Sequence, residues 1–128
     1  MSYKFIPVLS EDSIRRGLQR INKLGSPYWD VELYDTPRMH VLKVHYKLKN
    51  FKTTWEFLNL VANQASKLRH HPTIITTYNN VSIECTTHDA ENSITEKDVN
   101  LAEAIHLEYQ ELISKDVSKD VSKDVRMQ

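Results

Sequence analysis

The sequence predicts an α+β domain in which a four-stranded antiparallel sheet carries its helices on one face, in the order α-β-β-α-β-β-α. Some stretches alternate apolar and polar residues with a period of two, and others repeat apolar residues at helical spacing. The strands also come in pairs between helices, which favours hairpins over parallel βαβ units. At 128 residues the chain has the size of one domain. We expect this domain over residues 1–113, followed by a polar tail over 114–128.

The first helix is expected between Ser10 and Gly25. Ser10 suits the N-cap position, and the acids at positions 11 and 12 suit the positive end of the helix dipole. Gly25 can adopt the left-handed backbone that ends a helix. The apolar residues at helical spacing are Ile14, Leu18, Ile21 and Leu24. The segment is therefore predicted to be an amphipathic helix with both ends marked.

Two strands are expected next, over 28–34 and 42–48, joined by a turn at 35–38. The first is rich in aromatic and β-branched residues, and the turn reads Asp-Thr-Pro-Arg. In the second strand an apolar set alternates with a polar set: Leu42, Val44, Tyr46 and Leu48 against Lys43, His45, Lys47 and Lys49. Such alternation is typical of a strand with one buried and one solvated face.

The second helix is expected over 51–69, because Pro72 disfavours helical geometry in the residue before it. We expect its main apolar face to consist of Phe51, Trp55, Leu58, Ala62 and Ala65, with Leu68 as a further candidate. Phe57, Leu60 and Val61 widen this face beyond what one contact with a sheet requires. A helix that is apolar over so wide an arc indicates an additional contact with a partner subunit.

The second strand pair is expected over 74–77 and 81–87, with a turn at Asn79-Asn80. Cys85 alternates with polar neighbours, so we expect it to face the core, where a thiol is usually inert. Thr95 and Asp98 have the spacing of a capping arrangement that opens a last helix. The tail repeats Ser-Lys-Asp-Val, and its low hydrophobicity favours a solvated extension over a docking segment.

The composition excludes several classes of function. Seventeen basic residues balance 17 acidic ones, which removes the electrostatic case for nucleic acid or an anionic membrane as a direct partner. With 2 glycines the chain has no glycine-rich phosphate or dinucleotide loop, and with 1 cysteine it has no internal disulfide or CxxC pair. No apolar run reaches the length of a membrane span or a secretory signal. We expect a cytoplasmic protein.

Three of the 6 histidines share a distinctive context. His70 and His71 precede Pro72 at the exit of the second helix, and His88 follows the last strand. A hairpin between the two strands returns His88 towards His71, so we expect three imidazoles at one edge of the sheet. His40, His45 and His106 are expected at the surface.

Converging imidazoles suit two kinds of chemistry. Neutral histidine can give or take a proton near neutral pH. Three ring nitrogens with Asp89 or water could instead hold zinc, but adjacent histidines usually point apart and no HExxH spacing exists. Compensation of the helix dipole and packing of the loop are structural alternatives for the His70-His71 pair. We favour acid–base chemistry, with no metal and no cofactor.

The stretch from Phe51 to Ile105 resembles the pterin-4a-carbinolamine dehydratase family. The matching pieces are Phe51, Phe57, Val61-Ala62, Leu68, His70-His71-Pro72, Tyr78-Asn79, Val81, Thr87-His88, Thr95, Asp98 and Leu101-Ala102. The resemblance implies removal of water from a 4a-hydroxytetrahydropterin to give the quinonoid dihydropterin, as in the recycling of tetrahydrobiopterin. It also implies a homodimer or homotetramer. Some members instead act as dimerisation cofactors of a transcription factor, which gives a non-catalytic binding module as the alternative.

The resemblance assigns roles to particular residues. His70, His71 and His88 match the catalytic histidines of the family, and Trp29 matches a residue near the pterin that could pack against its ring. Thr87 is implied as a second substrate-binding residue. Asp98 matches an acid at the edge of the site, although a plain helix cap would explain it equally well.

Two departures from the family pattern bear on activity. Ser66 stands where the family usually has an ionisable residue, four positions before the first histidine, and a serine cannot set the charge state of His70 as a carboxylate would. The loop over 89–94 is one residue longer than the common pattern and lacks the glycine of the family.

Overall fold

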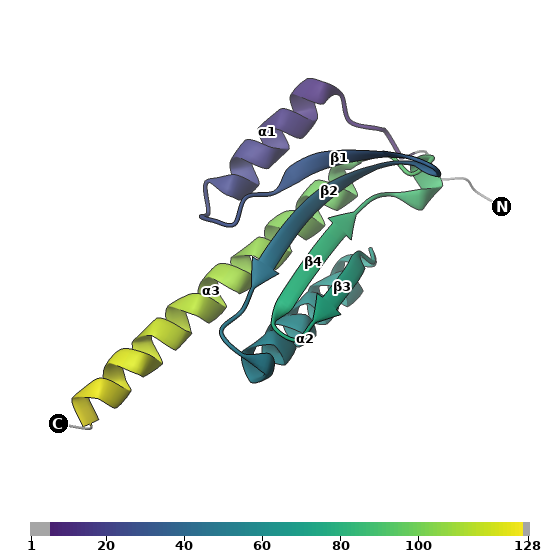
Figure 1. Ribbon diagram of the computed structural model, residues 1–128. Helices are drawn as coiled ribbons and strands as arrows, with labels where there is room; N and C mark the ends of the chain where they lie inside the picture. Colours follow the sequence, from purple (N-terminus) through teal and green to yellow (C-terminus); the bar gives the residue numbers. More distant parts are fainter. Residues whose placement is uncertain (1–5, 127–128) are drawn as a thin grey trace.

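The computed structural model describes residues 6–126, with side chains as far as residue 115. Its elements are α1 (Glu11–Asn22), β1 (Asp30–Asp35), β2 (Arg38–Lys47), α2 (Phe51–Leu68), β3 (Thr73–Thr77), β4 (Asn80–Cys85), the short 3-10 helix η1 (His88–Ala90) and α3 (Glu96–Arg126). All strand pairs are antiparallel, and the sheet order is β1-β2-β4-β3 (Figure 1). This arrangement confirms the predicted fold class and element order.

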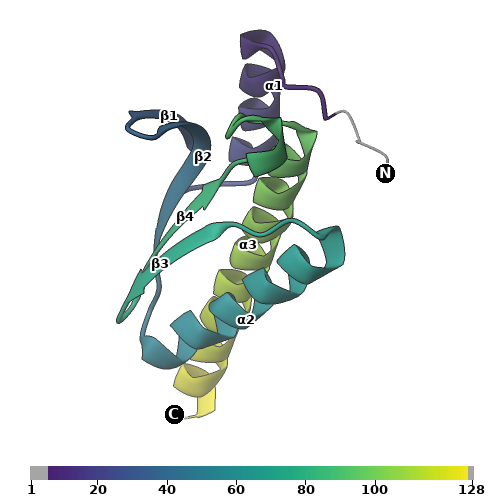
Figure 2. The same ribbon diagram turned by 90° about the vertical axis from the view of Figure 1, so that its right-hand side faces the viewer.

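The three α-helices lie on one face of the sheet, and the other face is open to solvent (Figure 2). α3 packs against both α1 and α2 and so forms the centre of the helical layer. The core lies between this layer and the sheet. Its largest fully buried side chains include Trp29, Tyr46, Phe57, Ile83, Leu101 and Ile105.

α1 begins where the sequence predicts. The side chain of Ser10 accepts a hydrogen bond from the backbone N–H of Ser13 at 3.1 Å. The helix ends at Asn22, and Gly25 lies beyond it with φ 130°, a backbone conformation that favours glycine, in the turn that leads to β1. Gly17 faces α3, where a Cβ atom would lie 3.0 Å from Val99, so its lack of a side chain permits the close approach of the two helices.

The predicted alternation in the two central strands is confirmed. Leu42, Val44 and Tyr46 of β2 are at most 2% exposed, while His45 between them is exposed. In β4 the buried positions are Val81, Ile83 and Cys85. Burial raises the pKa of the Cys85 thiol well above its ordinary value, which agrees with an inert core position.

The predicted apolar face of α2 is wrong at four of its positions. Phe51 and Trp55 are 54% and 48% exposed, and Ala62 and Leu68 are also exposed. The side chains that face the core are Thr54, Phe57, Leu58, Val61 and Ala65. Their spacing of three, four and seven residues forms its own helical stripe, and the exposed residues lie beside it. The wide apolar arc therefore consists of a core face and a separate solvent-facing one.

His106 is a second correction. We expected it at the surface, but it is fully buried, with Nδ1 2.8 Å from the Tyr46 hydroxyl and Nε2 2.6 Å from the carbonyl oxygen of Gly25. The Tyr46 oxygen in turn accepts the indole N–H of Trp29 at 3.0 Å. The turn after α1 covers this part of α3, and it supplies the backbone acceptor that makes burial of the imidazole possible.

α3 runs without a break through position 113 to Arg126, so no change of secondary structure separates the expected domain from the expected tail. The side chains of the tail beyond residue 115 lie outside the described residues. Within the described part of the chain, no helix combines the length and apolar character that crossing a bilayer requires.

Candidate active site

His70, His71 and His88 line one cavity of about 220 Å³. Three segments build it: the exit of α2, the stretch after β4, and the first turn of α3. The other lining residues are Arg69, Thr86, Thr87, Asp89 and Lys97. The structure thus brings together the three histidines that the sequence analysis singled out, from segments well separated along the chain.

The position of His70 follows from the way α2 ends. Arg69 adopts a left-handed conformation with φ 53°, and the N–H of His70 bonds to the carbonyl of Ala65 at 3.1 Å. This C-terminal turn stops the helix before Pro72 is reached. His70 therefore lies just beyond the end of α2, beside the first turn of α3.

Asp98 is the buried centre of the site. It has no exposed surface, and its Oδ1 lies 2.6 Å from His70 Nε2. Its Oδ2 accepts the hydroxyl of Thr87 at 2.7 Å and the backbone N–H of Thr95 at 2.9 Å. The contact with Thr95 is a helix cap, and the same carboxylate also contacts His70, so Asp98 does more than cap the helix.

The carboxylate determines which nitrogen of His70 carries hydrogen. A carboxylate only accepts hydrogen bonds, so Nε2 of His70 is the donor to Asp98. In the neutral ring the lone pair then lies on Nδ1, which bonds to no other residue in the described part of the chain. His70 is 12% exposed at its side chain, so this nitrogen belongs to a group that is held in place and still accessible.

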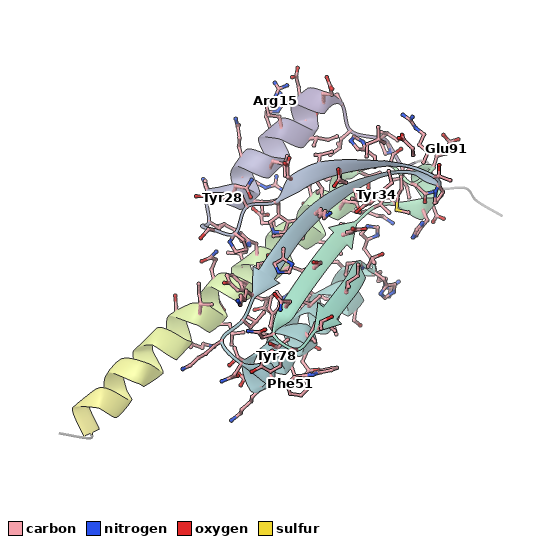
Figure 3. All side chains as sticks on the ribbon, viewed as in Figure 1. Arg15, Tyr28, Tyr34, Phe51, Tyr78 and Glu91 are labelled. Atoms are coloured by element: carbon pink, nitrogen blue, oxygen red, sulfur yellow. The ribbon has the colours of Figure 1, made fainter. Side chains whose placement is uncertain are left out.

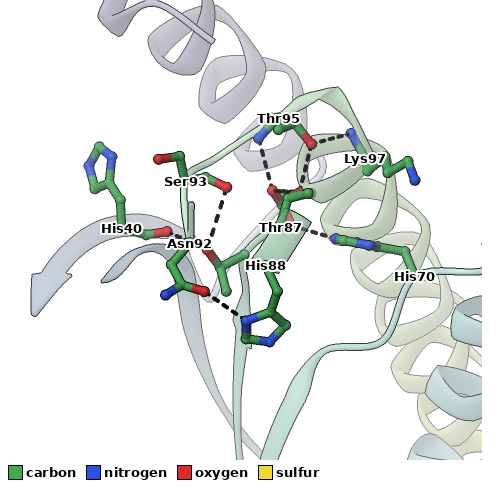
Figure 4. A network of polar contacts seen from close by, with 10 residues as sticks. His40, His70, Thr87, His88, Asn92, Ser93, Thr95 and Lys97 are labelled. Carbon is green, nitrogen blue, oxygen red and sulfur yellow. Dashed lines mark hydrogen bonds and ion pairs between the residues drawn. The ribbon is translucent and has the colours of Figure 1, made fainter. Parts of the chain in front are cut away.

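His88 is held by a different partner. Its Nδ1 donates to Oδ1 of Asn92 at 2.7 Å, across the loop that follows η1 (Figure 4). This leaves Nε2 without a protein partner among the described residues. His71 is exposed and forms no side-chain hydrogen bond there. Within residues 6–115, no group of three or more histidine, cysteine or acidic side chains has the arrangement of a metal site.

Two residues predicted to bind substrate have other surroundings. Trp29 is 2% exposed and packs edge-on against Tyr46 in the core, and it is not among the residues that line the histidine cavity. Thr87 lines the cavity, but it is 3% exposed and its hydroxyl hydrogen is used by Asp98. Trp29 therefore belongs to the core and is not part of the histidine cavity.

The sequence analysis missed Asn92 and Arg69 as parts of the site. Asn92 bonds to His88 from four residues away, inside a loop where Glu91 and Asn92 both have left-handed backbones with φ 56° and 55°. The sequence analysis predicted Arg69 only as the last residue of the second helix. Its left-handed conformation depends on tertiary packing, and the spacing of apolar residues carries no signal for it.

The fold and the cavity together define a small α+β protein with three histidines around one cavity. Residues 7–107 match the family described as Pterin 4 alpha carbinolamine dehydratase. The chain belongs to this family.

Relatives and a solved structure agree with this assignment. The chain is 34% identical to a protein of Herpetosiphon aurantiacus named "Putative pterin-4-alpha-carbinolamine dehydratase". The match extends over 100 residues and covers 78% of the chain and 92% of the relative. A protein of the same name from Thermomicrobium roseum is 47% identical over 57 residues, 44% of the chain and 60% of that relative. A crystal structure of a transcriptional coactivator/pterin dehydratase from Brucella melitensis superposes with a TM-score of 0.65 at 26% identity, over 80% of the chain and 98% of that structure.

Proposed function

We propose that this protein is a lyase that removes water from a 4a-hydroxytetrahydropterin and yields the quinonoid dihydropterin. The observation that carries the proposal is the single cavity lined by His70, His71 and His88. Membership of the dehydratase family supplies the substrate class. The cytoplasmic location and the link to tetrahydrobiopterin recycling stay predictions from the sequence.

The reaction needs two proton transfers. The bond between C4a and the hydroxyl oxygen breaks, and the oxygen leaves as water once an acid has given it a proton. A proton on a ring nitrogen is lost to a base, and its electrons complete the new double bond of the product. Side chains that titrate near neutral pH can perform both steps, and imidazole is the side chain that does so without large perturbation.

His70 has the surroundings of the base. Its Nε2–H is fixed by the buried carboxylate of Asp98 at 2.6 Å, which leaves Nδ1 to take a proton from the substrate. The same carboxylate stabilises the imidazolium that forms, as a buried aspartate does for the histidine of a catalytic triad. The proton for the departing hydroxyl then comes from the imidazolium form of His88, through Nε2, which has no protein partner among the described residues, or from the imidazolium form of His71.

The proposal is tested with chemically generated carbinolamine in a stopped assay. Wild-type protein is expected to accelerate dehydration above the uncatalysed rate, and an equal rate with and without protein contradicts the proposal. Ser66→Glu is the informative variant, because it introduces a carboxylate where the family usually has an ionisable residue. Ser66 is exposed in the last turn of α2 and is not among the residues that line the cavity, so the change leaves that lining intact. A gain in rate shows that the missing carboxylate limits turnover.

A second candidate function rests on an exposed apolar surface made of Phe51, Trp55 and Tyr78. These residues are 54%, 48% and 62% exposed, and the ring of Phe51 lies 6.3 Å from that of Trp55 and stacks on that of Tyr78 at 6.4 Å (Figure 3). β3 beside them is an edge strand with every residue exposed. Surfaces of this kind mark protein–protein contacts. The similar Brucella protein carries the words transcriptional coactivator in its description.

We propose that the main role of this surface is to join copies of the chain into a dimer or tetramer. Light scattering after size exclusion gives the test, with Trp55→Glu expected to lower the molar mass and Glu56→Lys as an exposed control on the same helix. A wild-type monomer contradicts the homo-oligomer. Binding of a pterin without turnover, together with a co-purifying protein, favours the non-catalytic module instead.

A further inference from the structure

Behind His70 and Asp98 lies a chain of hydrogen bonds that takes no direct part in the proposed proton transfers. The hydroxyls of Thr87 and Thr95 lie 2.7 Å apart, and Thr95 Oγ1 also accepts the backbone N–H of Lys97 at 3.3 Å (Figure 4). Thr87 and Thr95 are 3% and 0% exposed. Both side chains are therefore buried, and their hydroxyls form hydrogen bonds with protein groups.

The direction of each hydrogen bond follows from counting hydrogens. A threonine hydroxyl has one hydrogen, and that of Thr87 goes to Asp98 Oδ2. The bond between the two threonines must then be donated by Thr95 and accepted by Thr87. Together with the N–H of Thr95 and the Nε2–H of His70, every hydrogen in the cluster points towards the carboxylate.

This one-directional arrangement fixes the carboxylate in space. Oδ2 is held by two donors, one from the end of β4 and one from the start of α3, so the side chain cannot rotate without losing one of them. Oδ1 is then aimed at His70 and sets both the ring orientation and the nitrogen that keeps its hydrogen. Partners that orient a functional histidine from behind commonly affect activity as strongly as direct contacts.

The structure assigns Thr87 and Thr95 as positioning residues that act on His70 through Asp98. Neither hydroxyl needs to touch substrate, because Thr87 spends its hydrogen on Asp98 and Thr95 is fully buried. The effect on turnover rests on the proposed dehydratase function, whereas the effect on His70 does not.

The first test reads His70 without substrate. In full-length protein labelled with ¹⁵N-histidine, the Nε2–H proton of His70 is expected to resonate downfield and to exchange slowly with water, because it donates to a buried carboxylate at 2.6 Å. Thr87→Val and Thr95→Val are expected to move it upfield or broaden it by exchange. An unchanged resonance, or one further downfield because a less solvated carboxylate pulls harder, overturns the inference.

Matched variants separate positioning from general loss of packing. Thr95→Ser keeps the hydroxyl and is expected to restore the wild-type resonance. Thr54→Val removes another fully buried hydroxyl, which donates to the carbonyl of Asn50 at 2.7 Å. Thr54 lies near the start of α2, at the opposite end from His70, so this change is expected to leave the His70 resonance unchanged. If Thr54→Val shifts the His70 signal as much as Thr87→Val does, the positioning role is wrong.

The second test measures turnover. Thr87→Val is expected to lower kcat for carbinolamine dehydration roughly tenfold with KM nearly constant, the size expected for a lost hydrogen bond to a charged group. In an Asp98→Asn background the same change is expected to have no further effect. A Thr87→Val effect that persists undiminished without the carboxylate overturns the route through Asp98. If wild-type protein shows no turnover, the dehydratase proposal fails while the resonance test still decides the positioning role.

Discussion

Two buried polar clusters lie along α3, and each contains one histidine. In the first, His70 bonds to Asp98 through Nε2, and its Nδ1 has no protein partner in the part of the chain that the structure describes. In the second, both ring nitrogens of His106 are engaged, one by the hydroxyl of Tyr46 and the other by the carbonyl of Gly25. The side chain of His70 is 12% exposed, and His106 is fully buried.

The difference separates a histidine available for chemistry from one that serves the fold. A proton can reach His70 through a ring nitrogen that the protein leaves unbonded. His106 has no such nitrogen, and burial lowers its pKa, an effect partly offset by the hydrogen bond to Gly25. Counting the hydrogen-bond partners of each ring nitrogen therefore distinguishes the two roles more directly than residue type or burial does.

The largest expected effect is on the rate of dehydration. His70→Ala and His88→Ala are each expected to reduce it by about 100-fold or more, because each removes an acid or base from the reaction. His45→Ala is the matched control, since His45 bonds to Ser82 and Asn80 on the open face of the sheet. Circular dichroism checks that the variants fold. Wild-type rates in both cavity variants contradict a role of these two histidines in the reaction.

The next effect is on stability. His106→Leu is expected to lower the free energy of unfolding by about 2 kcal/mol, because the Tyr46 hydroxyl and the Gly25 carbonyl lose their partner. Urea denaturation measures it. The rate of dehydration per folded molecule is expected to stay near that of wild type. Adding Tyr46→Phe to His106→Leu is expected to cost less than the sum of the two single changes, since the orphaned hydroxyl is then gone.

The pH dependence of stability gives a smaller effect. The pKa of His106 is lowered by burial, so the unfolded chain binds its proton more readily than the folded protein does. Stability from this residue is therefore fully present above the ordinary histidine pKa of 6.5 and is lost as the pH falls below it. The slope is at most about 1.4 kcal/mol per pH unit. Urea midpoints at pH 7.5 and at lower pH, compared between wild type and His106→Leu, isolate this contribution, and parallel curves contradict it.

The smallest effect concerns the loop that holds His88. Glu91 has a left-handed backbone with φ 56°, which costs energy for any residue with a Cβ atom. Glu91→Gly is expected to raise the free energy of unfolding by about 0.5–1 kcal/mol. Glu91→Ala removes the same charge and keeps the backbone cost, so no comparable gain is expected from it. Equal gains from the two changes point to charge rather than backbone conformation.

The elements that the sequence predicts well are those whose signals are local. Alternation in β2 identifies its buried residues because the period of a strand has only two faces, and Ser10 marks the start of α1 by a contact three residues away. α2 shows where this fails. Its apolar arc is too wide for spacing alone to select the face, and the choice depends on how the helix packs on the sheet.

The site shows the same division. The sequence identifies His70, His71 and His88, and the family resemblance adds Asp98. The bond between His70 and Asp98 joins residues 28 positions apart, and the burial of His106 depends on a carbonyl 81 positions away. Such partners are chosen by the tertiary fold, which no local pattern encodes. For the same reason the sequence could not show that the hydroxyl of Thr87 is committed to Asp98.

The unbroken course of α3 has a practical consequence. Asp98 lies in its first turn, and the helix continues to Arg126 (Figure 1). With a rise of 1.5 Å per residue, 31 residues span about 46 Å, so the last turn lies far from the histidine cavity. Attaching the protein to a sensor chip through its C-terminus should therefore hold the entrance to the cavity clear of the chip and open to small molecules in the flow.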